Sequence, residues 1–258
     1  PSALIASAVC CKGCRKIEEN FGELKMMMKK MRFAGAVILI ALLLAASIVP
    51  ENPFYLVNWA LFSVIIVGLA LILFFWRFEK RRISSKEVAL VAALASLAAI
   101  ARVPFTVIMS LQPTTFLVMI SGYVFGAQTG FMVGALAALV SNFFLGQGPW
   151  TPWQMFCWGM CGVGAALLGT CGKGYQPVAF AALAGVSGYL FGWVMNIWHW
   201  VSFVYPLSWE TFLATYALSF PFDTVHAMGN IVFSLVFGKS FYHILLRFKK
   251  KLTVTVSA

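Results

Sequence analysis

The amino-acid sequence is dominated by long apolar runs that are separated by short polar or basic segments. Hydrophobic residues make up 61% of the 258 residues and charged residues only 10%. This composition argues against a disordered chain and for an integral membrane protein. The length gives room for about eight spans of roughly 20 residues each. We therefore expect an all-α membrane protein that is embedded in a lipid bilayer.

The runs divide the chain into an extension of two spans and a larger unit of six spans. The predicted segments are a basic tail at 1–33, a two-span extension at 34–82, a six-span unit at 86–247 and a basic C-terminal tail at 248–258. Pro104 is expected to end or kink the first span of the six-span unit, and Pro221 to break its last span. The expected fold is a six-helix bundle that follows two further helices.

The basic residues predict how the chain is oriented. The formal net charge is +11, and the basic residues lie beside apolar runs, which is typical of a cytoplasmic membrane face and not of a nucleic-acid groove. With the N-terminus inside, 18 of the 19 Lys and Arg residues fall on the inner face, and Arg102 alone falls outside. The pattern favours a multi-pass protein of the cell membrane with both termini cytoplasmic.

The six cysteines form no evident disulfide framework. Cys157, Cys161 and Cys171 lie in or beside apolar segments and are expected to be buried thiols. Cys10, Cys11 and Cys14 form a tight cluster, but no second pair of ligands follows, so lipidation or no role is favoured over a metal site.

Small residues are sorted onto one side of the run from Glu87 to Phe105. At about 100° per residue, one sector holds Ala89, Ala92, Ala93, Ala95, Ser96 and Ala99. A small face lets another backbone approach closely in lipid, where packing and not the hydrophobic effect joins helices. The face could pack against a helix of the same chain or form a docking strip for another subunit.

Polar and aromatic residues gather at the predicted outer ends of the six-span unit. Polar groups in a membrane are costly and usually face the bundle interior, and aromatic walls with a few amide and imidazole groups suit a flat organic ligand. The Trp residues could instead form an interfacial belt, and the Asp223–His226 pair a structural hydrogen bond. The candidate substrate-binding residues are Gln112, Asn142, Gln147, Trp150, Trp153, Gln154, Asn196, His199, Trp200, Asp223, His226 and Asn230.

Signals for an enzyme are weak. The sequence has no His-Glu-x-x-His, no Gly-x-Ser-x-Gly and no phosphate-binding Gly-x-x-x-x-Gly-Lys-Ser/Thr motif. We therefore expect no catalytic or metal-binding residues and no cofactor in this chain. An intramembrane enzyme that uses Asp223 and His226 remains an alternative of a different class.

The six-span unit resembles the substrate-binding S-component of energy-coupling factor (ECF) vitamin transporters. The segment from Lys86 to Ser96 resembles the alanine-rich first core helix of that family, and Thr115–Gly126 followed by Gly130–Ala135 resembles its second-to-third helix turn. Gly148–Gln154 resembles the external loop, and Pro221–Asn230 resembles the opening of the last core helix. The resemblance covers residues 86–247 and gives no account of residues 1–82.

The resemblance implies a function and a set of partners. Ala89 and Ala93 match the family's AxxxA strip, which docks on an EcfT-like transmembrane coupling subunit, and Ala92 and Ser96 widen it. Two cytoplasmic ABC ATPases would use the ATP, because the chain has no ATPase motif of its own. The S-component would capture a vitamin from outside and topple in the membrane to deliver it. Cobalamin or another corrinoid is the first choice of ligand, and riboflavin, a queuosine precursor or another heteroaromatic vitamin is the alternative.

Overall fold

A computed structural model describes residues 64–65, 67–69, 71–73, 75–76, 84–108, 110–172 and 174–254. The chain divides into two compact units, Pro1–Val57 and Asn58–Ala258, and every described residue lies in the second. The predicted N-terminal tail, the first predicted span of the extension and the cluster from Cys10 to Cys14 lie outside the described residues.

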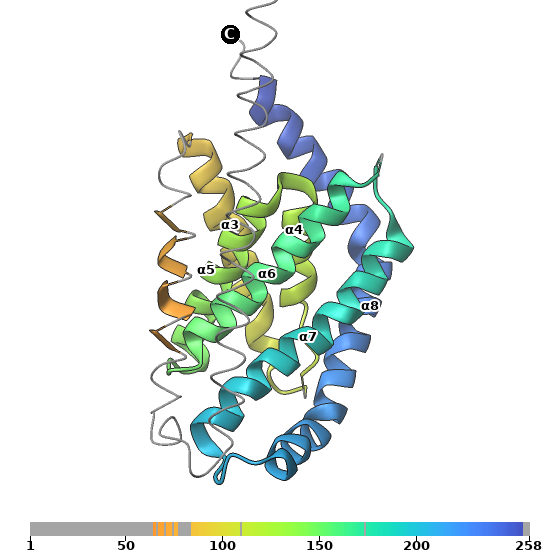
Figure 1. The fold of residues 1–258 in the computed structure, drawn as a ribbon. Coiled ribbons are helices and arrows are strands. Elements are labelled where there is room, and N and C mark those ends of the chain that lie inside the picture. The colour runs from red at the N-terminus through yellow and green to blue at the C-terminus, as the bar shows by residue number, and fades with distance from the viewer. Residues whose placement is uncertain are drawn as a thin grey trace, which may run out of the picture. The chain divides into compact units, whose positions relative to one another are not determined.

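Every described element is a helix, and six of them follow Ser84 (Figure 1). The first four are α3 (Ser85–Phe105), α4 (Thr114–Phe125), α5 (Ala127–Leu145) and α6 (Thr151–Thr170), and the last two are α7 (Pro177–Phe203) and α8 (Trp209–Val254). By length and hydropathy, α3, α5, α7 and residues Trp209–Leu252 of α8 could each cross a membrane. The described part of the chain is therefore all-helical, and four of its helices are compatible with the predicted membrane protein.

The first of these helices, α3, begins with a side-chain cap and buries only one of its faces. The backbone N–H of Glu87 donates to Ser84 Oγ at 3.2 Å, which satisfies one free donor of the first turn. The buried residues of α3 are Val91, Ala95, Ala98, Ala99 and Arg102. The predicted sector of small residues is thus divided: Ala95 and Ala99 pack inside, whereas Ala89, Ala92, Ala93 and Ser96 are exposed.

Glycines bring α4, α5 and α6 into backbone contact. A Cβ atom on Gly162 would lie 2.5 Å from the backbone of Gly130, and one on Gly122 would overlap the carbonyl of Gly162. Farther along α5, a Cβ on Gly134 would lie 2.5 Å from the backbone of Trp158. Small residues allow such approach, which gives membrane helices their packing energy. These three helices therefore form a closely packed layer with little room for added atoms.

The helix pair α7 and α8 is joined in a similar way. A Cβ on Gly188 would lie 2.7 Å from Cα of Ala227, and one on Gly192 would overlap the carboxylate of Asp223. The prediction that Pro221 breaks the last span is wrong, because α8 runs without interruption for 46 residues. Pro221 lacks a backbone N–H and so removes one helical hydrogen bond, but the helix continues past it.

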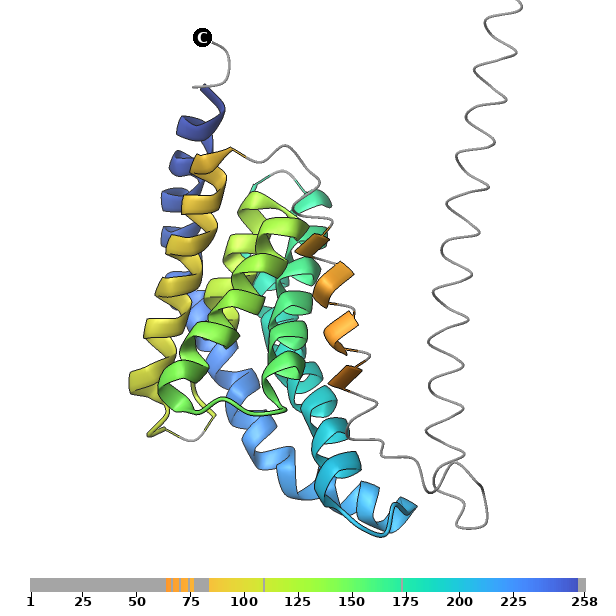
Figure 2. The same cartoon turned by 90° about the vertical axis from the view of Figure 1, so that its left-hand side faces the viewer.

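The connections α3–α4, α5–α6 and α7–α8 lie at the same end of the helical unit (Figure 2). We call this the loop end. At the opposite end Tyr123 donates to the carbonyl of Gly174 at 2.8 Å, and the rings of Tyr175 and Tyr242 stack with centroids 5.3 Å apart.

Cys157 and Cys161 are buried free thiols as predicted, whereas Cys171 is exposed because α6 ends one residue before it.

Candidate functional site

A charged side chain lies inside the loop end of the bundle. Arg102, in the last turn of α3, is only 8% exposed. Its Nε donates to Gln112 Oε1 at 3.1 Å, and its Nη1 donates to Ser141 Oγ at 2.6 Å and to Asn142 Oδ1 at 2.7 Å. The guanidinium is therefore held by neutral acceptors from α5 and from the segment before α4.

The acceptors of Arg102 are themselves fixed by a second set of hydrogen bonds. Asn142 Nδ2 donates to Thr151 Oγ1 at 3.0 Å and to Gln154 Oε1 at 2.8 Å. Thr151 Oγ1 in turn donates to Gln147 Oε1 at 2.9 Å. These bonds join the end of α5 to the start of α6. We call the whole set the Arg102 cluster: Arg102, Gln112, Ser141, Asn142, Gln147, Thr151, Gln154 and Trp158.

Trp158 covers one face of the guanidinium and connects it to α8. Arg102 Cζ lies 4.7 Å from the centroid of the Trp158 ring, which is a cation–π distance. Trp158 is fully buried, and its Nε1 donates to Thr115 Oγ1 at 3.0 Å. Thr115 Oγ1 also forms a hydrogen bond of 2.9 Å with His226 Nε2. A continuous polar path therefore crosses the bundle from α3 to α8.

No carboxylate neutralises Arg102 among the residues that the structure describes. The acidic residues there are Glu87, Glu210 and Asp223, and none of them forms an ion pair with Arg102. Glu87 lies at the opposite end of α3, and Asp223 accepts a hydrogen bond from Ser219 at 3.1 Å. A buried cation without an opposite charge is costly, so such groups in membrane proteins mark functional sites.

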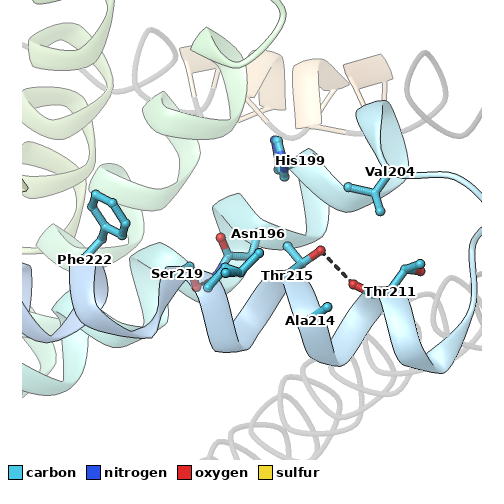
Figure 3. A pocket seen from close by; sticks show the side chains of 9 residues that line it. Asn196, His199, Val204, Thr211, Ala214, Thr215, Ser219 and Phe222 are labelled. Atoms are coloured by element: carbon cyan, nitrogen blue, oxygen red, sulfur yellow. Dashed lines mark hydrogen bonds between the residues drawn. The ribbon is translucent and has the colours of Figure 1, made fainter.

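A second polar region at the loop end is an open groove between α7 and α8 (Figure 3). Its volume is about 430 Å³. Asn196 Nδ2 donates to Ser219 Oγ at 2.6 Å across the two helices, and Thr215 Oγ1 donates to the carbonyl of Thr211 at 2.8 Å. The groove is lined by Asn196, His199, Val204, Thr211, Ala214, Thr215, Leu218, Ser219 and Phe222.

The groove and the polar path from Arg102 reach α8 at positions one helical turn apart. Phe222, at one end of the groove, precedes His226 by one helical turn on the same face. His226 is the α8 end of the polar path through Thr115 and Trp158. Phe191 of α7 packs between Trp158 and His226, and its ring centroid lies 4.7 Å from that of Trp158 and 5.3 Å from that of His226. Phe191 therefore connects Trp158 of the cluster with His226, which lies one turn from the groove residue Phe222.

The structure brings most of the predicted site residues to these two regions. Gln112, Asn142, Gln147 and Gln154 belong to the Arg102 cluster, and His226 ends its polar path. Asn196 and His199 line the groove, while Asp223 is hydrogen-bonded to its Ser219. Trp200 Nε1 donates to Thr211 at 3.0 Å beside the groove.

Three predicted residues make other contacts. Trp150 packs edge-on against Trp198 with ring centroids 6.1 Å apart. Trp153 packs against a cluster of Val67, Leu71, Phe131 and Ala135, on another side of α6. The fully buried Asn230 donates to the carbonyl of Ala184 at 3.2 Å, and its Oδ1 has no hydrogen-bond partner among the residues that the structure describes.

Asp223 and His226 are both buried on α8, but they do not form the hydrogen-bonded pair that the sequence suggested. Asp223 is bound to Ser219, and its carboxylate faces Gly192 of α7. His226 is bound to Thr115 of α4 instead. The two side chains therefore link α8 to different helices.

Sequence reasoning missed the centre of the site. Arg102 falls in the polar group at the predicted outer end but is not among the candidate binding residues, and neither are Thr115, Ser141, Thr151 and Trp158. The available signal was Arg102 itself, because an isolated charge beside an otherwise apolar run requires polar partners from other helices. The partners are neutral and distant in sequence, so their identity required the three-dimensional arrangement.

The fold and this site define an all-helical protein whose apolar helices enclose one polar cluster. Residues 81–252 match the family model described as "Family of unknown function (DUF6580)", so the chain belongs to this family. The match spans all the helices from α3 to α8 up to residue 252, and thus both polar regions. No curated protein and no solved structure matches the chain.

Proposed function

We propose that this chain is the substrate-binding membrane subunit of an ECF-type ABC importer. It would capture a small organic molecule at the loop end and pass it to partner subunits. The observation that carries the proposal is the buried Arg102 cluster inside an apolar bundle, because buried polar groups in membrane proteins mark ligand or ion sites. In this proposal the protein is a multi-pass protein of the cell membrane, and both termini are cytoplasmic.

The exposed small face of α3 supports a docking function. Ala89, Ala92, Ala93 and Ser96 are exposed, and Ala93 borders an apolar groove of about 200 Å³ that α4 and α8 complete. A strip of small side chains allows a partner helix to approach closely in lipid. The proposed partners are an EcfT-like coupling subunit on this strip and two cytoplasmic ABC ATPases that use the ATP.

The size of the α7–α8 groove bears on the choice of substrate. Its volume of about 430 Å³ lies toward the small end of the range of roughly 300–1,000 Å³ for ligand sites. Riboflavin or a queuosine precursor suits a groove of this size better than cobalamin. A corrinoid, the first choice from the sequence, would require α7 and α8 to move apart.

Reconstituted uptake tests the proposal. The chain is combined in proteoliposomes with an EcfT-like subunit and two ABC ATPases, and the uptake of labelled riboflavin, cobalamin, a queuosine precursor and a heteroaromatic carboxylic acid is measured with and without ATP. We expect ATP-dependent uptake of one of them. Uptake of none, or uptake that does not depend on the ATPases, would contradict the proposal.

A substitution on α3 separates docking from binding. Ala93→Trp should abolish uptake and leave ligand binding intact, because the indole blocks the close approach of a partner helix. Ala182→Trp, at an exposed position of α7, is the matched control and should retain uptake. Normal uptake by Ala93→Trp would show that this strip is not the docking surface.

The alternative of an intramembrane enzyme predicts turnover of a lipid or peptide substrate by the purified chain alone. Asp223 and His226 make separate hydrogen bonds, so the geometry offers this alternative no acid–base pair in direct contact.

A further inference from the structure

We propose that Arg102 binds a carboxylate of the ligand through its Nη2 group, so the substrate is a singly charged organic acid. The inference rests on the proposed function in one respect, namely that a small organic molecule binds at the loop end. It adds the chemical class of that molecule and the atom that recognises it. Among the substrates considered above, it favours a heteroaromatic vitamin with a carboxylate over riboflavin, cobalamin or a queuosine precursor, which have none.

The hydrogen bonds of the guanidinium leave one nitrogen free. Arginine carries five N–H donors, one on Nε and two on each Nη. Nε is used by Gln112, and the two protons of Nη1 are used by Ser141 and Asn142. Neither proton of Nη2 has an acceptor among the residues that the structure describes. A carboxylate or phosphate oxygen is the acceptor that a guanidinium binds most strongly.

The charges around Arg102 favour one negative charge on the ligand. Its three hydrogen-bond acceptors are neutral, so the local charge remains +1. Lys86 lies in the first turn of α3 and Arg247 near the end of α8, and both of these helix ends lie opposite the loop end (Figure 2). A carboxylate would neutralise the site, whereas a doubly charged phosphate would leave a buried negative charge, which is costly. The ligand group is therefore a carboxylate.

The position of Trp158 restricts the direction of approach. The indole covers one face of the guanidinium at 4.7 Å, so the carboxylate must meet Nη2 from the side or in the guanidinium plane. The cluster is not sealed, because Gln147 is exposed and Gln112 and Gln154 are only half-buried. Their amides can both donate and accept hydrogen bonds, which suits the polar atoms of an attached ring.

Thermal unfolding with a matched pair of small probes tests the inference. The full chain is purified in detergent, and its melting temperature is measured over a millimolar range of benzoate and of benzamide. The two probes have the same ring and differ in the charge of one group. We expect benzoate to raise the melting temperature in a saturable way and benzamide to leave it unchanged, because a ligand that binds only the folded state stabilises it.

Two arginine variants provide the matched comparison. Arg102→Gln should weaken benzoate binding by about ten- to hundredfold, as the loss of a charge-assisted hydrogen bond predicts. Arg247→Gln removes an exposed arginine at the opposite end and should bind benzoate like the unsubstituted chain. Arg102→Lys keeps the positive charge but lacks the planar guanidinium with its several N–H donors. It should therefore bind benzoate more weakly than the unsubstituted chain but still in preference to benzamide. This variant serves where Arg102→Gln does not fold.

Each contrary result overturns the inference. Equal effects of benzoate and benzamide, no effect of benzoate, or an unchanged benzoate effect in Arg102→Gln would each exclude a carboxylate site at Arg102. Stronger stabilisation by phenyl phosphate than by benzoate would exclude the singly charged ligand.

The uptake experiment is separate: a benzoate site without ATP-dependent uptake contradicts only the transporter function, and uptake without a benzoate site contradicts only this inference.

Discussion

The two polar regions at the loop end are built in opposite ways. The Arg102 cluster holds one buried charge among neutral acceptors, and α5 and α6 approach each other closely beside it, where Gly134 contacts the backbone of Trp158. The α7–α8 groove is open, and it is lined by hydroxyl groups, an amide, an imidazole and apolar side chains. His226 contacts the polar path of the cluster and follows the groove by one turn.

This difference suggests that the cluster and the groove have different functions in ligand binding. Side chains whose neighbours are fixed present a ligand with groups that need no rearrangement, which favours tight and specific binding. An open groove can adapt to the remainder of the ligand. We therefore expect substitutions in the cluster to affect stability and binding together, and substitutions in the groove to affect mainly binding.

The largest expected effect comes from the glycine contact between α5 and α6. Gly162→Ala places a methyl group against the backbone of Gly130, so we expect a loss of about 3 kcal/mol in unfolding free energy. Gly164→Ala is the control on the same helix. Nothing lies within 4 Å of its Cβ position, and the better helix propensity of alanine should make it neutral or stabilising by up to about 1 kcal/mol. Chemical unfolding in detergent measures both, and similar values would refute the close contact.

A pair of asparagine substitutions compares the two regions directly. Asn142→Ala removes an acceptor of Arg102 and the donor to Thr151 and Gln154, so we expect a loss of about 2–3 kcal/mol. Asn196→Ala removes one half-buried hydrogen bond to Ser219 in the groove and should cost less than about 1 kcal/mol. If Asn196→Ala proved the more destabilising, the distinction between a rigid cluster and an adaptable groove would be lost.

Chemical labelling should reveal that a water-soluble reagent reaches the groove more readily than it reaches the polar path at Thr115. In a background with Cys10, Cys11, Cys14 and Cys171 replaced by serine, Thr215→Cys in the groove should react with a water-soluble maleimide within minutes. Thr115→Cys, at a fully buried position of α4, should react far more slowly because the folded chain excludes the reagent. Mass spectrometry of the labelled protein measures both rates, and equal rates would mean that the polar path at Thr115 is as accessible as the groove.

Much of the fold could be predicted from the pattern of apolar runs. The apolar runs Phe131–Leu145 and Pro177–Trp200 lie within α5 and α7, and α3 ends at Phe105 next to Pro104, as expected. The failure at Pro221 has a local cause. Proline removes one hydrogen bond, but whether a helix ends there depends on how its two halves pack, and sequence alone does not reveal that packing.

The candidate site was predicted less completely than the fold. Amide and imidazole residues such as Gln112 and His226 could be selected because polar groups are rare in apolar runs. The burial of Arg102 could not be predicted, because α3 is apolar on all sides and periodicity does not show which face is buried. For the same reason, the division of the small residues between Ala95, which is buried, and Ala93, which is exposed, required the structure.

Native mass spectrometry of the purified chain shows whether a small molecule binds at Arg102. We expect the unsubstituted chain and Arg247→Gln each to retain a small molecule from the cell, and Arg102→Gln to retain none. A small molecule that remains bound to folded Arg102→Gln, or none on the unsubstituted chain, would contradict this expectation.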